Sequence, residues 1–278
     1  LSKSETDSFS KLIMNARKQF ETVFDGDLFA GSVGEVTNEI ETKISQLFPE
    51  FLANMWIDTS SERYSFRYED LPPSAIEEHY ENSMSQNIHI NFEEGSPVVL
   101  YGSTEAEQKS KGAYYTDHQF VEYMVSQSVD IKFDNLIEEL AEAVENNKNI
   151  EIAIKQLLDF KVADLTCGGG SFLRGAFLKL ASKHAAISSI SLSEETLHKY
   201  PMLKKGSEGE AKWESYILNN MIYGVDFDYK AVLITSLTLS LTTIEHRDIS
   251  EELPSLIGKN LIHQNSLTKK EDIKGFLN

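Results

Sequence analysis

The chain has 278 residues with 41% hydrophobic residues and six prolines, a composition that excludes a disordered chain and indicates a packed core. Its start is polar and acidic, unlike a signal peptide, and no apolar run reaches the roughly 18 residues that a membrane span needs. The net charge of −18 is uneven, with 11 Lys and Arg against 28 Asp and Glu in residues 1–150, and 15 against 16 in residues 151–278. A phosphate-binding surface needs clustered cations, so the first half is poorly suited to binding nucleic acid.

The first hundred residues predict a mainly helical, acidic domain. Apolar side chains recur there at helical spacing, and Pro72-Pro73 is suited to the first turn of a helix. A polar, Gly-, Ser- and Lys-containing run over residues 102–112 indicates a domain boundary. The predicted elements are helices over 9–24, 36–56 and 75–84, a strand over 64–68, and a hairpin formed by 88–92 and 98–101. We therefore predict an amino-terminal domain over 1–108 and a second domain over 109–278.

The second domain changes from helices to an alternation of strands and helices. Thr116 or Asp117 can cap the helix that follows it, because either side chain accepts from an orphan N–H. The predicted elements are helices over 135–146, 150–160, 171–186, 212–221 and 229–245, strands over 161–166, 222–225 and 261–264, and a soluble insertion over 188–209. Such alternation predicts an α/β fold with a parallel sheet, whose ligand site lies at the carboxyl ends of its strands.

Three consecutive glycines, Gly168, Gly169 and Gly170, lie between a predicted strand and a predicted helix. Residues without a β-carbon let the backbone approach a ligand closely and adopt positive φ, and N–H groups at a helix start favour an anionic or polar ligand. A plain tight turn is the alternative. The spacing is not that of a dinucleotide loop, because G-x-G-x-x-G is absent, and this disfavours a nicotinamide dehydrogenase.

Polar residues follow the second and third strands of this part. Asp226 ends one strand, where its carboxylate can accept both hydroxyls of a ribose, and Asp228 is the better candidate for the helix cap. Asn265 follows the next strand and can bond an adenine edge, or it can be a turn residue. Cys167, the only cysteine, excludes an internal disulfide and fits a reducing, cytoplasmic location. It has no His close in sequence to act as its base, which favours a small buried residue, and the histidines show no metal-ligand spacing.

Taken together, these segments resemble the S-adenosylmethionine-dependent adenine-N6 DNA methyltransferases of restriction–modification systems. Fused restriction–methylation enzymes (type IIG) and type I modification subunits are the nearest in pattern. The resemblance rests on four segments, which are Gly112–Thr116, Asp164–Leu173, Tyr223–Asp228 and Asn265–Leu267. Their order, with the Tyr-Thr segment before the glycine loop, is that of the gamma group. The resemblance implies a Rossmann-like class I methyltransferase sheet and S-adenosylmethionine as the cofactor.

The resemblance also implies roles for single residues. Tyr115 and Thr116 would border the methionine end of the cofactor, and Asp226 would bind its ribose. The remaining predicted contacts are Asp164, Cys167, Gly168 and Gly170 along the amino-acid portion, Phe227 packed on the adenine, and Asn265 near the adenine amino group. The chain departs from the family pattern in two places, because Leu165 replaces the usual Pro and Gly169 the usual Ser.

The family's catalytic segment, (Asn/Asp)-Pro-Pro-(Tyr/Phe), is absent, since no proline follows Pro254 and the only Pro-Pro pair precedes the glycine loop. We therefore expect an amino-terminal fragment, inactive alone, of a site-specific adenine methyltransferase. The expected partners are double-stranded DNA, bound through regions mostly beyond residue 278, and a restriction or specificity subunit or fused domain. The alternatives are a fragment of an RNA or protein-glutamine methyltransferase, and a non-catalytic module in which residues 1–108 bind a partner.

Overall fold

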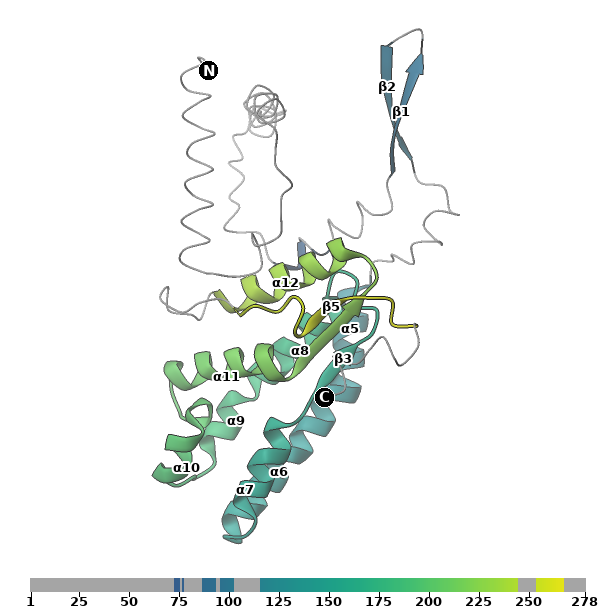
Figure 1. Ribbon diagram of the computed structural model, residues 1–278. Coiled ribbons are helices and arrows are strands. Elements are labelled where there is room, and N and C mark those ends of the chain that lie inside the picture. The colour runs from purple at the N-terminus through teal and green to yellow at the C-terminus, as the bar shows by residue number, and fades with distance from the viewer. Residues whose placement is uncertain are drawn as a thin grey trace, which may run out of the picture. The chain divides into compact units, whose positions relative to one another are not determined.

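The computed structural model describes residues 73–75, 77, 87–93, 96–102, 116–244 and 254–267 (Figure 1). Its contacts divide the chain into two compact units, and almost all described residues belong to the unit made of Pro73–Arg247 and Leu256–Asn278. The predicted helices over 9–24 and 36–56 and the strand over 64–68 lie outside the described residues, and the boundary after residue 108 stays a prediction. Within the described part, every helix is too short or too polar to cross a membrane.

The predicted hairpin is confirmed. Strand β1 (Asn87–Glu93) pairs antiparallel with β2 (Ser96–Gly102), with Asn87 opposite Gly102 and Glu93 opposite Ser96. Upstream of it, the described residues Pro73–Ala75 and Glu77 are helical, as expected where a proline pair opens a helix. The rest of the predicted helix over 75–84 lies outside the described residues.

A run of helices leads to the sheet. It consists of α5 (His118–Val125), the π-helix η2 (Ser126–Asp130), α6 (Ile131–Glu145) and α7 (Ile150–Leu158). Of the two candidate caps, Asp117 is the one used, because its Oδ1 accepts from the Gln119 N–H at 2.8 Å. The helices α6 and α7 pack side by side after a short turn (Figure 1).

Three parallel strands form the sheet, in the order β3 (Val162–Asp164), β4 (Ile222–Asp226) and β5 (Leu261–His263). Helix α8 (Ser171–Ser182) follows β3 and packs on β3 and β4, and α12 (Tyr229–Ile244) follows β4 and packs on β4 and β5. The two helices also contact each other. The predicted α/β alternation is thus confirmed as a β-α-β-α-β unit with three parallel strands.

The predicted soluble insertion over 188–209 is more structured than its composition indicates. The connection from α8 to β4 forms α9 (His184–Ser189), α10 (Glu194–Lys199), the 3-10 turn η3 (Pro201–Leu203) and α11 (Ser207–Asn220). Leu203 is 1% exposed, and the buried Trp213 donates its Nε1–H to the Leu180 carbonyl at 2.9 Å. Buried apolar side chains such as these fix a connection that also carries many polar residues.

Gly224, in the middle of β4, lies close to side chains of α8, β5 and the loop after β3. A β-carbon at this position would lie 2.7 Å from Leu173 Cδ1, 2.9 Å from Leu261 Cδ2 and 3.2 Å from Cys167 Sγ. The glycine therefore allows the helix, the neighbouring strand and the loop after β3 to pack on one point of the sheet. This packing places the start of α8 beside the end of β4.

Candidate functional site

The carboxyl ends of the three strands meet at one edge of the sheet. Strand β3 ends at Asp164, β4 at Asp226 and β5 at His263, and the register places Asp226 beside His263. In parallel sheets this edge is where ligands bind, because the loops and helix N-termini that follow the strands open there. The predicted residues at the ends of the strands are thus brought together.

The glycine loop is tied to the end of β4 by its backbone. Cys167 donates its N–H to the Val225 carbonyl at 2.9 Å, and Gly168 donates its N–H to Asp226 Oδ2 at 2.9 Å. Gly168 and Gly170 have positive φ, at 54° and 92°, a conformation that side chains rarely adopt. The loop therefore turns directly against the carboxylate that the sequence predicts as a ribose ligand.

Asp226 is 8% exposed, and its carboxylate accepts hydrogen bonds from two backbone N–H groups. Its Oδ1 accepts from the Asp228 N–H at 2.8 Å, in addition to the bond between Oδ2 and the glycine loop. Asp228 in turn accepts from the Lys230 N–H at 2.9 Å, which confirms it as the cap of α12. Each oxygen of Asp226 keeps a second lone pair, so the same carboxylate can also accept from a diol.

Sequence reasoning missed Thr235, which supports the glycine loop from α12. Its Oγ1 donates to the Gly168 carbonyl at 2.9 Å, and a β-carbon on Gly170 would lie 2.8 Å from both Oγ1 and Cγ2 of Thr235. The available signal was a set of small polar residues within an apolar helix, all of them buried, namely Thr235, Ser236, Thr238, Ser240 and Thr243. Thr238 and Thr243 donate to carbonyls one turn back in the helix, whereas Thr235 donates to the loop.

Asp164 at the end of β3 is half-buried, and Cys167 in the loop that follows is buried. Burial raises the pKa of Asp164 above its ordinary value, and the nearby charge of Asp226 raises it further, while the carboxylate accepts from the Thr166 N–H at 3.0 Å. Burial, reinforced by the charge of Asp226, raises the pKa of the Cys167 thiol to about 12. Cys167 is therefore a neutral thiol near pH 7 and a poor nucleophile, in agreement with the prediction of a small buried residue.

Exposed aromatic rings border the same edge. Phe227 is 60% exposed, directly after Asp226, and its carbonyl lies 2.9 Å from His263 Nε2. The His263 ring packs against Tyr229 with 5.4 Å between ring centroids. Asn265 is exposed, and its Oδ1 accepts from the Leu267 N–H at 2.9 Å, so it forms the turn that the sequence left as the alternative.

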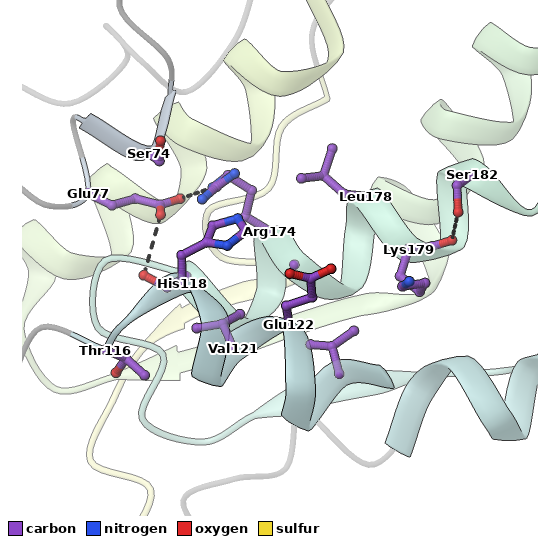
Figure 2. A pocket seen from close by; sticks show the side chains of 13 residues that line it. Ser74, Glu77, Thr116, His118, Val121, Glu122, Arg174, Leu178, Lys179 and Ser182 are labelled. Atoms are coloured by element: carbon purple, nitrogen blue, oxygen red, sulfur yellow. Dashed lines mark hydrogen bonds and ion pairs between the residues drawn. The ribbon is translucent and has the colours of Figure 1, made fainter. Parts of the chain in front are cut away.

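The predicted residues upstream of the sheet are described only in part. Thr116 is half-buried and lines a cavity of about 280 Å³ beside α5 and α8, whereas Tyr115 lies outside the described residues. This cavity, shown in Figure 2, is lined by Ser171 of the first α8 turn but not by Asp164, Gly168 or Asp226. It is therefore a neighbour of the strand-end site and not the same space.

The chain matches no protein-family model. It is similar to a protein of Methanocaldococcus jannaschii that is assigned by its name as a type II restriction enzyme and methyltransferase, with 27% identity over 166 residues. The match covers 52% of this chain but 13% of the relative. The similarity indicates a relationship to restriction–modification methyltransferases.

Proposed function

We propose that this chain is the methyl-donor-binding portion of a site-specific adenine-N6 DNA methyltransferase of a restriction–modification system. The observation that carries the proposal is the bond from the Gly168 N–H to Asp226 Oδ2, which joins the glycine loop to the acid at the end of the next strand. Backbone amides at a helix start and a carboxylate suited to a diol form a donor set for an adenosine-containing cofactor. The name of the similar M. jannaschii protein supports a methyltransferase over other users of such cofactors.

The residues of the strand-end site fit S-adenosylmethionine. The glycine loop at Gly168 and Gly170 has no side chains in the way of its amino-acid portion, and Asp226 offers free lone pairs to its ribose hydroxyls. Phe227 presents an exposed ring for the adenine, and Asn265 would approach the adenine amino group. Asp164, Cys167, Tyr115 and Thr116 complete the proposed set. When bound, the cofactor supplies an electrophilic methyl group, and these residues hold and orient it.

Adenine specificity and the DNA partner follow from the family resemblance and are parts of the same proposal. In the resembling enzymes the target base is flipped out of the duplex and stacked on the aromatic ring of the (Asn/Asp)-Pro-Pro-(Tyr/Phe) segment. This segment does not occur in the 278 residues, so the chain would bind the donor without presenting the acceptor. We propose a Rossmann-like methyltransferase sheet for the whole enzyme, double-stranded DNA as its substrate, and the cytoplasm as its location.

Cofactor binding tests the proposal most simply. Titration calorimetry with S-adenosylhomocysteine should show one binding site, and Asp226→Ala should abolish the heat while the variant stays folded. Incubation of the chain with S-adenosylmethionine and unmethylated DNA should give no methyl transfer. Methylation of RNA or of a protein glutamine by the complete enzyme would favour the alternative substrates, and a folded chain without cofactor affinity would favour an interaction module.

A further inference from the structure

A buried carboxylate lies in the wall of the cavity beside α8. Glu77 is 2% exposed, and it comes from the short described helical segment that precedes the β1–β2 hairpin. Figure 2 shows its side chain pointing toward Arg174, above His118 and Thr116. A carboxylate so far out of water is stable only where other groups compensate it.

The compensating groups belong to the first turns of α8. Arg174 Nε donates to Glu77 Oε1 at 2.6 Å, and Ser171 Oγ lies 3.4 Å from Glu77 Oε2. Both partners of the ion pair are largely buried, since the side chain of Arg174 is 11% exposed and that of Glu77 is 3% exposed. Burial raises the pKa of Glu77, because the loss of hydration outweighs the opposing hydrogen bond and charge of Arg174.

The turn that Glu77 holds continues directly into the glycine loop. Ser171 follows Gly170, and the Arg174 N–H donates to the Gly170 carbonyl at 2.8 Å in the first backbone bond of the helix. A negative charge beside a helix N-terminus also interacts favourably with the exposed amides. Glu77 therefore restrains the first turn of α8, which directly follows the glycine loop.

We propose that Glu77 is a positioning residue of the methyl-donor site, acting through Ser171 and Arg174 on the glycine loop. This inference rests on the proposed function, since it concerns the affinity of the same site. It also assigns Glu77 to the domain that binds the methyl donor, although the sequence predicts the domain boundary after residue 108. The conformation of the loop thus depends on Glu77, whose partners Ser171 and Arg174 lie more than 90 positions later in the sequence.

The test compares Glu77→Gln with Asp130→Asn in the full 278-residue chain. Gln keeps the size of the side chain and an acceptor oxygen but removes the charge. Asp130 ends η2 and pairs with Lys179 and Lys183 near the carboxyl end of α8, so its variant removes ion pairs to the same helix at the end away from the loop. Two quantities are measured well below the unfolding temperature, which are the affinity for S-adenosylhomocysteine and the hydrogen exchange of the amides at 170–174.

We expect Glu77→Gln to weaken the affinity about tenfold, within the usual range of coupling between sites, and to speed exchange of the Arg174 amide. Asp130→Asn should lower thermal stability and leave both quantities unchanged. Wild-type affinity and exchange in Glu77→Gln, or equal changes in both variants, would overturn the inference in favour of general stabilisation.

A second variant covers the case in which Glu77→Gln leaves Arg174 buried without a counter-ion and fails to fold. The double variant Glu77→Gln/Arg174→Gln removes both charges and is expected to fold and to show the same tenfold loss. If the folded wild-type chain does not bind S-adenosylhomocysteine at all, the proposed function fails. The exchange measurement then still decides whether Glu77 holds the turn, because it needs no cofactor.

Discussion

Replacing Gly170 by Ala tests the packing of the glycine loop against α12. The backbone there has φ of 92°, and the added methyl would lie 2.8 Å from Thr235 Oγ1 and Cγ2. Holding a side chain in the left-handed region costs about 1–2 kcal/mol, and overpacking costs about 1–3 kcal/mol. We therefore expect Gly170→Ala to lower the free energy of unfolding by about 2–5 kcal/mol.

A matched control separates the two contributions. Gly258 also has a positive φ, 78°, but no atom lies within 4 Å of a β-carbon placed there. Gly258→Ala should thus show the conformational cost alone, about 1–2 kcal/mol. Adding Thr235→Ala to each variant should relieve part of the cost at Gly170 and none at Gly258, because only the β-carbon added at Gly170 would contact that side chain.

Urea denaturation followed by tryptophan fluorescence measures these differences in the free energy of unfolding of the compact unit that contains the glycine loop. Trp213 is fully buried on α11, and the only other tryptophan, Trp56, can be replaced by Phe in all variants. Equal losses for Gly170→Ala and Gly258→Ala, or a loss at Gly170 that Thr235→Ala does not reduce, would refute the reasoning. It would mean that the loop does not pack on Thr235.

Three further predictions concern the strand-end acids and the cysteine. Asp226→Asn places an NH2 group against one of the backbone N–H groups from which the carboxylate accepts a hydrogen bond. It should therefore weaken S-adenosylhomocysteine binding about tenfold or more, whereas Asp228→Asn at the helix cap should leave the affinity unchanged. Equal affinities of the two variants would contradict the role of Asp226. Because the pKa of Asp164 is raised above 3.8, its contribution to stability is complete below that pH and is lost as the pH rises through the raised value. Asp164→Asn, which still accepts from Thr166, should then melt above the wild type at pH 7 with an advantage that shrinks toward pH 4, and a pH-independent difference would argue against it. Cys167 should react with Ellman's reagent only as fast as the chain unfolds, and reaction of the folded chain at the rate of a free thiol would disprove its burial.

The sequence alone predicted the elements around the sheet because their signals are local. Short apolar runs end at Asp164 and at Asp226, and each is followed by residues suited to a turn and then by a helix. The cap at Asp228 depends only on residues two positions away, so it too was predicted correctly. Local periodicity and capping chemistry are thus sufficient for the β-α-β-α-β unit.

The contacts that shape the site could not be predicted in this way, because they join residues far apart in the sequence. Thr235 looks like any small polar residue of a helix until the fold places it against Gly168 and Gly170. Glu77 lies in an acidic stretch, where a solvated side chain is the ordinary expectation, yet it is buried against Arg174. In both cases tertiary packing determines the burial and the contacts of the side chain, and no local sequence pattern predicts them.

The central claim is that the loop at 167–170 and Asp226 form a site for S-adenosylmethionine. Calorimetric titration of the folded 278-residue chain with S-adenosylhomocysteine, with a nicotinamide dinucleotide as the comparison ligand, tests it directly. We expect one-to-one binding of S-adenosylhomocysteine and no heat with the dinucleotide. A chain that unfolds cooperatively by Trp213 fluorescence but binds neither S-adenosylhomocysteine nor S-adenosylmethionine would contradict the claim.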